Sequence, residues 1–511
     1  MGFDYFMNPV AEWIGWFPKD YSREERVLVH KLDMLILFFA CASTWANNLD
    51  VGAIYNAYEG GMEEDLNLGG NRLTYLTSIY WAATTAFQVP CNILVTMVPA
   101  HYYIPACEVA WGLFTLGTAF VKNYEQLMVM RFFVGVTATP CWIANIHIIN
   151  CWYRKNELGK RNAIYYITYP LGSMFSGYLM TACLKLEGVG GLEGWRWLFI
   201  ICTIITIPLA IFGVIFYPNV PTNCHSRFLT EREKELAQVR LLKEGFAPSR
   251  GISKDLVWRS ASAWQTWCFF FLAGLFWLTP YPSTTPFLLW LGDTSTDKAF
   301  VNNASTITYA ISIFAAMFFA FYSDWRGKRW DSMLGSGIAV LMCNIMLLVW
   351  DISKGAKYFA FILLGFTQGP INVVMAWFAE SLAHDLEVRS VSFAFVNISY
   401  CLAQLILPLC VWQTKDAPRF KAGYIFVVCA SVLELLILPL PVYFERRDRK
   451  RGINQVEIVS QMAEVIGFDE ITREHGDVDE LGSISSKGEN IAKKDAAAVD
   501  VQEISGYSEK V

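Results

Sequence analysis

About twelve apolar stretches, each of about 20 residues, follow one another between Lys31 and Phe444. A helix of about 20 residues rises about 30 Å, which is the thickness of the hydrocarbon core of a bilayer. Lipid offers no hydrogen-bond partners, so a segment that crosses it must satisfy its own backbone, and an α-helix does so. The longest polar gap follows the sixth stretch. The sequence therefore predicts an all-α integral membrane protein with twelve transmembrane helices in two six-helix pseudo-repeats.

The positions of the apolar stretches define the expected spans and domains. We expect spans at 34–56, 73–97, 104–120, 126–149, 162–184, 195–217, 264–291, 304–322, 332–350, 358–380, 392–412 and 424–444. The expected domains are a cytoplasmic N-terminal segment at 1–33, a six-helix bundle at 34–217, a cytoplasmic central loop at 218–263, a second six-helix bundle at 264–444 and a cytoplasmic tail at 445–511.

Composition supports a membrane body and excludes several classes of protein. Charged residues make up 17% of the chain and hydrophobic residues 54%, whereas an ordinary soluble domain is about 25% charged. The sequence contains no HExxH, GxSxG, Walker loop or cysteine–histidine metal pattern, so we expect neither an enzyme nor an ATP-driven pump. The thirteen cysteines lie mostly inside apolar stretches and form no CxxC, which favours buried thiols. We expect no cofactor, no metal and no nucleic-acid partner.

The distribution of lysine and arginine predicts the orientation. With the N-terminus inside, the cytoplasmic segments carry about 25 basic residues and the external loops about 9, in line with the positive-inside rule. Both termini would then be cytoplasmic. Asn303 begins an Asn-Ala-Ser sequon in a predicted external loop, which makes it a candidate for glycosylation.

Two segments outside the spans have features of their own. The central loop contains LTEREKELAQVRLLKEG, in which Leu236, Val239 and Leu242 share one helix face. This pattern predicts either an amphipathic helix at the membrane surface or a solvated linker helix. Residues 453–511 are polar and poor in aromatics, and we expect them to be mostly disordered.

Two motifs resemble those of the major facilitator superfamily. The eighth predicted span ends in Asp324, Trp325, Arg326, Gly327, Lys328 and Arg329, similar to the loop signature of that superfamily. The glycine permits a tight turn, and the charges would latch neighbouring helix ends in one conformation. Arg131-Phe-Phe-Val-Gly135 in the fourth span resembles the intramembrane Arg-x-x-x-Gly element of the same superfamily.

A narrower resemblance covers nearly the whole predicted membrane body. The chain resembles the fungal anion:cation symporter family, which includes allantoate, nicotinate, biotin and pantothenate permeases. The residues that carry it include Lys31-Leu-Asp33, Trp152-Tyr153-Arg154, Gly172 to Gly177 and Gly194 to Ile201. The last two segments most resemble those of the vitamin permeases within that family, especially the pantothenate permeases.

The chain departs from that family at two charged positions. Members commonly carry an arginine where this chain has Val51, and many carry a proton-binding glutamate where it has Ala138. Asp50 and Arg131 remain. Desolvation raises the pKa of a buried carboxyl, and a nearby cation lowers it. When these two effects compete, the carboxyl can bind and release a proton. We therefore interpret Asp50 as a proton site, with Arg131 as its partner or an anion contact. His147 exchanges protons near neutral pH and is a third candidate for the proton path.

Amide and phenol side chains inside the predicted spans could line a substrate cavity. They give directional hydrogen bonds without the desolvation cost of a full charge, although single amides also join helices to one another. The candidates for substrate binding are Asn47, Asn48, Tyr55, Asn56, Asn145, Tyr169, Tyr281, Gln368, Asn372, Asn397, Tyr400 and Gln404.

The resemblance implies a proton-coupled transporter that imports a small organic anion, pantothenate above all, by alternating access. Biotin, allantoate or nicotinate are alternative substrates for the same mechanism. A non-transporting nutrient sensor with the same fold is an alternative of a different class. The expected partners are the organic anion, protons and the lipid bilayer. We expect a monomer, located in the plasma membrane.

Overall fold

The computed structural model describes residues 21–221, 224, 228–242, 254–382 and 386–451, and these residues form helices and connecting turns without a β-strand. The first half contains α2 (Arg23–Leu32), α3 (Phe38–Ala57), α4 (Glu63–Asp65), α5 (Arg72–Met97), α6 (Ala100–Thr118), α7 (Tyr124–Trp152), α8 (Lys155–Cys183), α9 (Gly194–Phe216) and α10 (Glu231–Leu242). The second half contains α11 (Lys254–Ser262), α12 (Trp264–Leu278), α13 (Thr285–Thr294), α14 (Lys298–Arg326), α15 (Arg329–Val349), α16 (Lys354–Phe366), α17 (Ile371–Ser381), α18 (Leu386–Cys410), α19 (Lys421–Ile437) and α20 (Pro439–Arg451).

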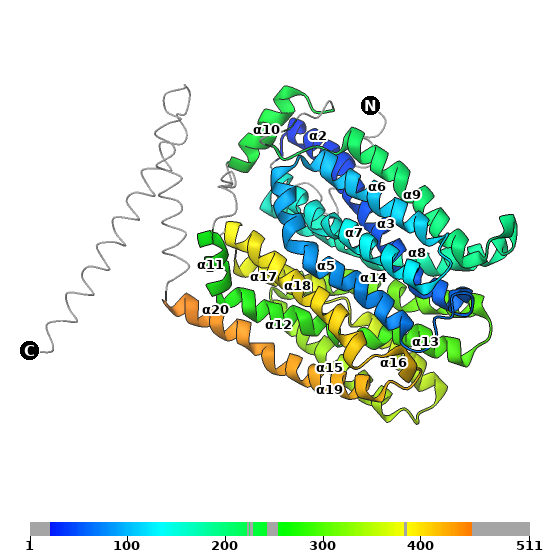
Figure 1. The fold of residues 1–511 in the computed structure, drawn as a ribbon. Helices are drawn as coiled ribbons and strands as arrows, with labels where there is room; N and C mark the ends of the chain where they lie inside the picture. The colour runs from blue at the N-terminus through cyan, green and yellow to red at the C-terminus, as the bar shows by residue number, and fades with distance from the viewer. Residues whose placement is uncertain (1–20, 222–223, 225–227, 243–253, 383–385, 452–511) are drawn as a thin grey trace, which may run out of the picture. The chain divides into compact units, whose positions relative to one another are not determined.

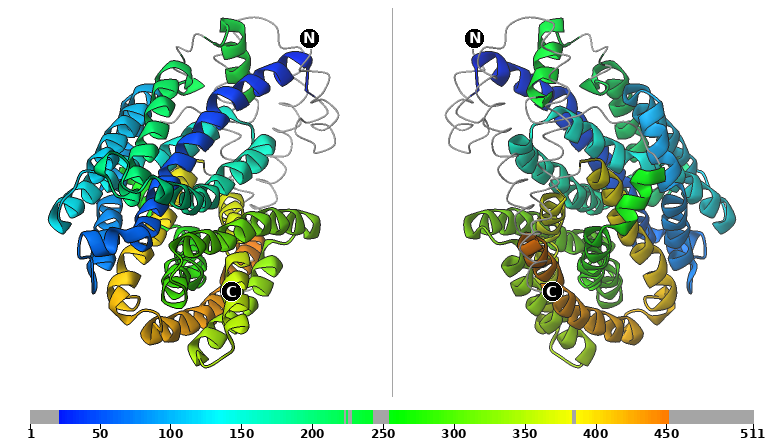
Figure 2. Two further views of the ribbon diagram at one scale, coloured as in Figure 1. Left: turned by 90° about the vertical axis from the view of Figure 1, so that its right-hand side faces the viewer. Right: turned by 90° about the vertical axis from the view of Figure 1, so that its left-hand side faces the viewer.

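The helices up to Val442 form two groups. In the first group α3 packs on α8, α5 on α7 and α6 on α9, and in the second α12 packs on α18 and α15 on α19. The groups meet where α8 lies against α14 and α5 against α18. Figures 1 and 2 show the blue-to-cyan helices gathered on one side and most of the green-to-orange helices on the other. Below, the end of the helices nearest α10 is called the α10 end, and the opposite end the α13 end.

The first helical segment is longer than the predicted span at 34–56. It starts at Ser22, whose Oγ accepts a hydrogen bond from the Glu25 backbone N–H at 3.2 Å, while the Glu25 carboxylate accepts one from the Ser22 N–H at 2.9 Å. This capping box satisfies two backbone donors at the helix start. The helix continues through single π-helical segments at Asp33–Leu37 and Tyr58–Met62.

Eight helical segments of the described residues are long and apolar enough to cross a bilayer, and the bent pair 256–262 and 264–294 would make a ninth. Helices α5, α6 and α8 occupy three further predicted spans but are not among those segments. The all-helical membrane fold is therefore confirmed, whereas the number of twelve spans stays a prediction.

Two helices of the second group are interrupted in the middle. Residues 279–284 separate α12 from α13, and Pro280 and Pro282 in this break cannot donate a backbone hydrogen bond. Residues 367–370 separate α16 from α17. The Gln368 Nε2 donates a hydrogen bond to the Ser283 Oγ at 2.9 Å, so the two breaks contact each other.

The central-loop helix packs on the first group of helices through a face that includes Leu236 of the predicted apolar face but not Val239. Ala237 and Arg240 are buried, whereas Val239 is exposed. The Arg240 Nη2 lies 2.5 Å from the Glu157 carboxylate, and the Lys31 Nζ lies 2.6 Å from the Glu233 carboxylate. These ion pairs between distant segments of the chain cannot be read from the apolar periodicity of α10 alone.

The chain divides into two compact units, Met1–Val442 and Tyr443–Val511. In the second unit the structure describes only the helical residues up to Arg451, so the predicted disorder of 453–511 lies outside the described residues. The predicted domain boundaries stay predictions.

Candidate functional site

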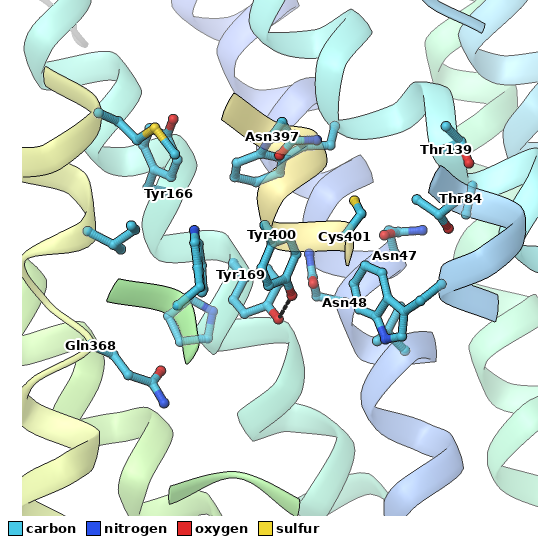
Figure 3. Close-up of a pocket in the computed structure, with 18 of the residues that line it drawn as sticks. Asn47, Asn48, Thr84, Thr139, Tyr166, Tyr169, Gln368, Asn397, Tyr400 and Cys401 are labelled. Atoms are coloured by element: carbon cyan, nitrogen blue, oxygen red, sulfur yellow. Dashed lines mark hydrogen bonds between the residues drawn. The ribbon is translucent and has the colours of Figure 1, made fainter. Parts of the chain in front are cut away.

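A cavity lies between the two groups of helices, about halfway along them (Figure 3). Its first wall comes from α3, α5, α7 and α8, and its second from α12, α14, α17 and α18. The lining residues are Asn47, Asn48, Val51, Tyr80, Trp81, Thr84, Gln88, Ala138, Thr139, Trp142, Tyr166, Tyr169, Pro170, Trp277, Ser312, Ala316, Gln368, Ile371, Asn372, Met375, Phe393, Asn397, Tyr400 and Cys401. None of these lining residues carries a charge. Amides, phenols, indoles, aliphatic hydroxyls and a thiol provide its polarity.

Aromatic side chains from both groups meet across the cavity. The hydroxyl groups of Tyr169 and Tyr400 are 2.7 Å apart and share a hydrogen bond, drawn as a dashed line in Figure 3. The ring centroids of Trp277 and Tyr400 lie 4.4 Å apart, and Trp81 meets Tyr400 edge-on at 5.2 Å. The cavity wall is therefore largely aromatic, and the Tyr169–Tyr400 hydrogen bond connects the two groups within it.

Two buried N–H donors of the cavity wall have no hydrogen-bond partner among the residues that the structure describes. They are the Gln88 Nε2 from α5 and the Trp277 Nε1 from α12. The Cys401 thiol donates to the Gln88 Oε1 at 3.4 Å, which orients the amide so that its oxygen faces the thiol. Unpartnered buried donors are costly, so a ligand with carbonyl or carboxylate oxygens would satisfy both.

Seven of the predicted substrate residues come together at this cavity. They are Asn47 and Asn48 on α3, Tyr169 on α8, Gln368 at the second break, Asn372 on α17, and Asn397 and Tyr400 on α18. Gln404 is not in the lining, but its Nε2 donates to the Tyr400 hydroxyl at 3.3 Å. It therefore contacts the site through Tyr400.

Four predicted substrate residues lie elsewhere. The Asn56 amide donates to the Ser176 Oγ at 2.9 Å and joins α3 to α8, while the Asn145 oxygen accepts from the Tyr217 hydroxyl at 2.9 Å. Tyr55 and Tyr281 line a second, smaller pocket nearer the α13 end. The sequence places these residues in apolar spans. The direction in which their side chains point depends on the rotation of each helix about its axis, and packing against neighbouring helices determines that rotation.

Asp50 and Arg131 are buried behind the cavity wall and are not part of the lining. The Thr115 hydroxyl donates to the Asp50 Oδ2 at 2.7 Å, and the other carboxylate oxygen has no partner within the described part of the chain. The Arg131 charge acts on Asp50, but the expected salt bridge is not among the ion pairs described, and the guanidinium lies over the Phe199 ring at 5.2 Å. Tyr80 of the cavity wall is within electrostatic reach of Asp50.

His147 occupies α7 closer to the α10 end, and its Nε2 lies 3.7 Å from the Cys151 Sγ. Neither side chain lines the cavity. A role for His147 in a proton path stays a prediction.

The residues of the predicted latch join helices within the second group. Gly327 ends α14 in the left-handed conformation with φ of 63°, where glycine has no steric penalty. Arg326 lies 3.1 Å from the Asp331 carboxylate and Arg329 lies 2.6 Å from that of Glu380. Lys328 immediately precedes α15, and the side chain of Asp324 lies outside the described residues. The latch role itself stays a prediction.

Asn303 lies inside α14, and the prediction of a loop at this position was wrong. Asp297 caps α14 by accepting hydrogen bonds from the backbone of Ala299 and Phe300, so the helix begins before the apolar stretch does. The Asn303 oxygen accepts from the Thr181 hydroxyl at 2.9 Å. A glycan on Asn303 would disrupt this contact between α14 and α8.

Sequence reasoning missed the contribution of α5 to the cavity. Tyr80, Trp81, Thr84 and Gln88 all line it and follow one another at helical spacing. This spacing within the predicted span at 73–97 was the available signal. Val51 and Ala138, where the resembled family carries charges, also line the cavity, so both departures contribute to its neutral character.

The profile of the Major Facilitator Superfamily matches residues 35–408. This chain belongs to the major facilitator superfamily. Among solved structures, a mutant of the nucleoside transporter NupG superposes with a TM-score of 0.55 at 13% identity, covering 79% of this chain and 98% of that one. At this identity the match shows the fold alone.

Curated fungal relatives match over most of the chain. A pantothenate transporter of Schizosaccharomyces pombe is 29% identical over 89% of this chain and 88% of its own. The vitamin H transporter of Saccharomyces cerevisiae is 28% identical, with 84% and 75% covered, and a pantothenate transporter of the same yeast is 29% identical, with 80% and 82% covered. The family identifies this chain as a multi-pass membrane transporter of small molecules rather than an enzyme.

Proposed function

We propose that this protein is a proton-coupled transporter that imports a vitamin with a carboxylate, pantothenate above all. The observation that carries the proposal is the pair of unpartnered N–H donors, Gln88 Nε2 and Trp277 Nε1, in a cavity wall without charged residues. An anion whose oxygens accept from both donors would bind to the two groups of helices at once. Relatives named as pantothenate transporters, matching at least four-fifths of this chain, support this substrate class.

Asp50 is the proposed proton site. Its carboxyl is buried beside one hydroxyl donor and within the field of Arg131, without an ion pair that would hold it permanently ionised. Such a carboxyl gains or loses a proton when its surroundings change. Tyr80 extends from this site to the cavity wall and would transmit the change to the substrate.

The contacts between the groups support alternating access. The Thr74 and Thr414 hydroxyls are 2.7 Å apart, Asn71 donates to Gln413 at 3.2 Å and Lys298 lies 3.2 Å from the Glu64 carboxylate. All of these contacts are at the α13 end. With the proposed orientation, in which both termini are cytoplasmic, the protein is closed toward the outside in this conformation. We place it in the plasma membrane, acting as a monomer.

The test is uptake of labelled pantothenate into fungal cells that lack their own permease. We expect saturable uptake that is greater at about pH 5 than at about pH 7.5 and that collapses with a protonophore, because the inward proton gradient drives it. Asp50→Asn should reduce accumulation at least tenfold while preserving exchange of labelled for unlabelled substrate. Asp351→Asn, which changes an exposed carboxylate, is the matched control and should behave as the natural protein.

Biotin is a second candidate because a vitamin H (biotin) transporter is also similar over most of the chain. Labelled biotin is therefore run in parallel. If biotin but not pantothenate is taken up, the substrate assignment changes to biotin and the proposed transport mechanism is retained. No uptake of either vitamin, nor of allantoate or nicotinate, from protein shown at the cell surface would contradict transport and favour the sensor alternative.

A further inference from the structure

A second buried carboxyl, Glu434 on α19, lies beside the break between α12 and α13, away from the substrate cavity. The Thr279 hydroxyl donates to the Glu434 Oε2 at 2.7 Å. The Asn344 amide on α15 donates to the Thr279 backbone carbonyl at 3.1 Å and to the Ser431 hydroxyl at 3.1 Å. Three helices therefore contribute polar groups to one cluster at the C-terminal end of α12.

Two acceptor oxygens of this cluster, the Glu434 Oε1 and the Asn344 Oδ1, have no donor among the residues described by the structure. The orientation of the Asn344 amide is determined by its two donated hydrogen bonds, so its oxygen cannot exchange places with its nitrogen. Glu434 is 1% exposed and Asn344 0%. Gly337 makes room for the free carboxyl oxygen, because a side chain there would begin 3.2 Å from the Glu434 Oε1.

No cationic side chain of the described residues belongs to the cluster. The interactions described for Glu434 are burial and the Thr279 hydrogen bond, without a charged neighbour among the described residues. The other titratable groups of α12, α15 and α19 are Cys268, Cys343, Cys429, Tyr424, Arg329, Asp331 and Lys421, and none of them acts on Glu434. An ionised carboxylate in the apolar interior is costly without a counterion. A proton on the Glu434 Oε1 removes the negative charge. It also turns this oxygen from an unpaired acceptor into a donor, which the unpaired Asn344 Oδ1 can accept.

The position of the cluster connects it to a movable element. Thr279 is the first residue of the break, and both its hydroxyl and its carbonyl are bound by the cluster. On the cavity side, Gln368 binds Ser283 in the same break. The break is thus bound from both sides, and α13 beyond it belongs to the end at which the two groups of helices meet. In many transporters interrupted helices form the substrate and ion sites, and the two groups of helices rock against each other around them.

We propose that Glu434 is a proton-binding site that clamps the break between α12 and α13. In the present conformation the carboxylic acid holds its proton, with Oε2 accepting from Thr279 and the O–H available to the Asn344 Oδ1. When the break opens, the O–H bond breaks and water accepts the proton as hydronium, leaving a carboxylate; closing reverses the step. The proton site stands on the cluster itself, whereas its role in the transport cycle rests on the proposed function.

The test is infrared spectroscopy of the purified full-length protein at neutral pH, compared between the natural protein and Glu434→Gln. We expect Glu434→Gln to lose the C=O stretching band of one protonated carboxylic acid, and Asp351→Asn to retain it. The natural protein and Glu434→Gln are each measured in sodium buffer and in a buffer in which a bulky organic cation replaces sodium. The proton assignment would be overturned if the natural protein and Glu434→Gln gave the same spectrum. It would also be overturned if the band appeared only without sodium, because a sodium ion would then be the counterion of Glu434.

Transport of the same variants tests the clamp. The glutamine amide retains an acceptor for Thr279 and a donor for Asn344, so Glu434→Gln should fold and reach the surface with unchanged thermal stability. It cannot release a proton, and net uptake should fall at least tenfold while substrate binding is retained. Normal uptake and pH dependence in this variant would refute the clamp. If the natural protein itself transports no vitamin, the proposed function fails, but the infrared result still decides the proton site.

Discussion

At the scale of single residues, Gln88 and Trp277 illustrate how unpartnered atoms, rather than charges, mark the proposed substrate site. The cavity lining contains no ionisable acid or base other than phenols and a thiol, so a search for charged pockets would pass over it. The two free N–H groups come from opposite groups of helices. A ligand that binds both would join those groups, which is how a substrate can favour one conformation of a transporter.

Trp277→Phe retains the aromatic ring and removes only the N–H donor. A hydrogen bond to a charged acceptor contributes about 1.5–3 kcal/mol, so KM for the vitamin should rise about 10- to 100-fold with the maximal rate little changed. Kinetics of labelled vitamin uptake measure this change. Trp267→Phe, on the same helix but exposed and outside the lining, is the control. An unchanged KM in Trp277→Phe would remove this donor from the proposed site.

At the scale of helices, small residues and local ion pairs decide which surfaces touch. Gly177 on α8 allows close approach of α14: a Cβ at this position would lie 2.6 Å from the Thr306 methyl and 2.7 Å from the Asn302 carbonyl. A backbone carbonyl cannot rotate away as a side chain can. The contact between α8 and α14 at the α13 end therefore requires glycine at position 177, because any larger side chain would clash with α14.

Gly177→Ala should weaken the conformation in which α8 and α14 touch. Overpacking costs about 1–3 kcal/mol, which shifts a two-state equilibrium by about 5- to 100-fold. We expect faster labelling of a cysteine introduced at Thr414 by a membrane-impermeant thiol reagent, and slower uptake. Gly335→Ala has no atom within 4 Å of the new Cβ and should leave both rates unchanged. Equal labelling in the two alanine variants would contradict the packing argument.

Docking of α10 should depend on pH through Glu233. Burial alone would raise the pKa of this carboxyl, but the hydrogen bonds from Lys31 and Thr230 lower it below its ordinary value of 4.5. A depressed folded-state pKa stabilises docking above the ordinary pKa and ceases to do so as pH falls through the lowered value. Hydrogen exchange of 231–242, corrected for its intrinsic pH dependence, should be slow at neutral pH and accelerate below about pH 4.5. In Glu233→Gln, which has no carboxyl to protonate at this position, we expect hydrogen exchange of 231–242 not to accelerate below about pH 4.5.

At the scale of the whole membrane body, the two groups of helices contact each other at the α13 end and beside the cavity. Thr74 and Thr414 are separated by 340 positions in the sequence, yet their hydroxyls are 2.7 Å apart. Asn71 reinforces the contact through Gln413 and the backbone of Lys415. A transporter that alternates must break these hydrogen bonds in every cycle.

Thr74→Cys combined with Thr414→Cys should therefore trap the protein. The two thiols would lie close enough for a disulfide, and oxidation should abolish uptake until a reductant restores it. Each single cysteine variant is the control and should transport before and after oxidation. Full uptake by the oxidised double variant, with the crosslink demonstrated on a gel, would contradict the requirement for opening at this end.

Several site residues were predictable because helical periodicity constrains them. Asn397 and Tyr400 share a face of α18, and both line the cavity. The sequence does not specify the rotation of each helix about its axis, so Asn56 and Asn145 were predicted at the site although they join helices elsewhere. Arg131 was interpreted as the partner of Asp50 or as an anion contact; its charge acts on Asp50, but the hydrogen bond described for that carboxylate comes from Thr115. The start of α14 was misplaced because a cap, not hydropathy, begins that helix.

The sequence by itself determined that this chain is a helical membrane protein, because a backbone in lipid must satisfy its hydrogen bonds locally. It also determined the superfamily, through residues spread over the whole membrane body. Only the tertiary structure decided which polar groups face the cavity and which close the α13 end. It also decided that Glu434 lies at the break beside Thr279. These outcomes depend on contacts between residues far apart in the chain, which packing creates and local pattern does not encode.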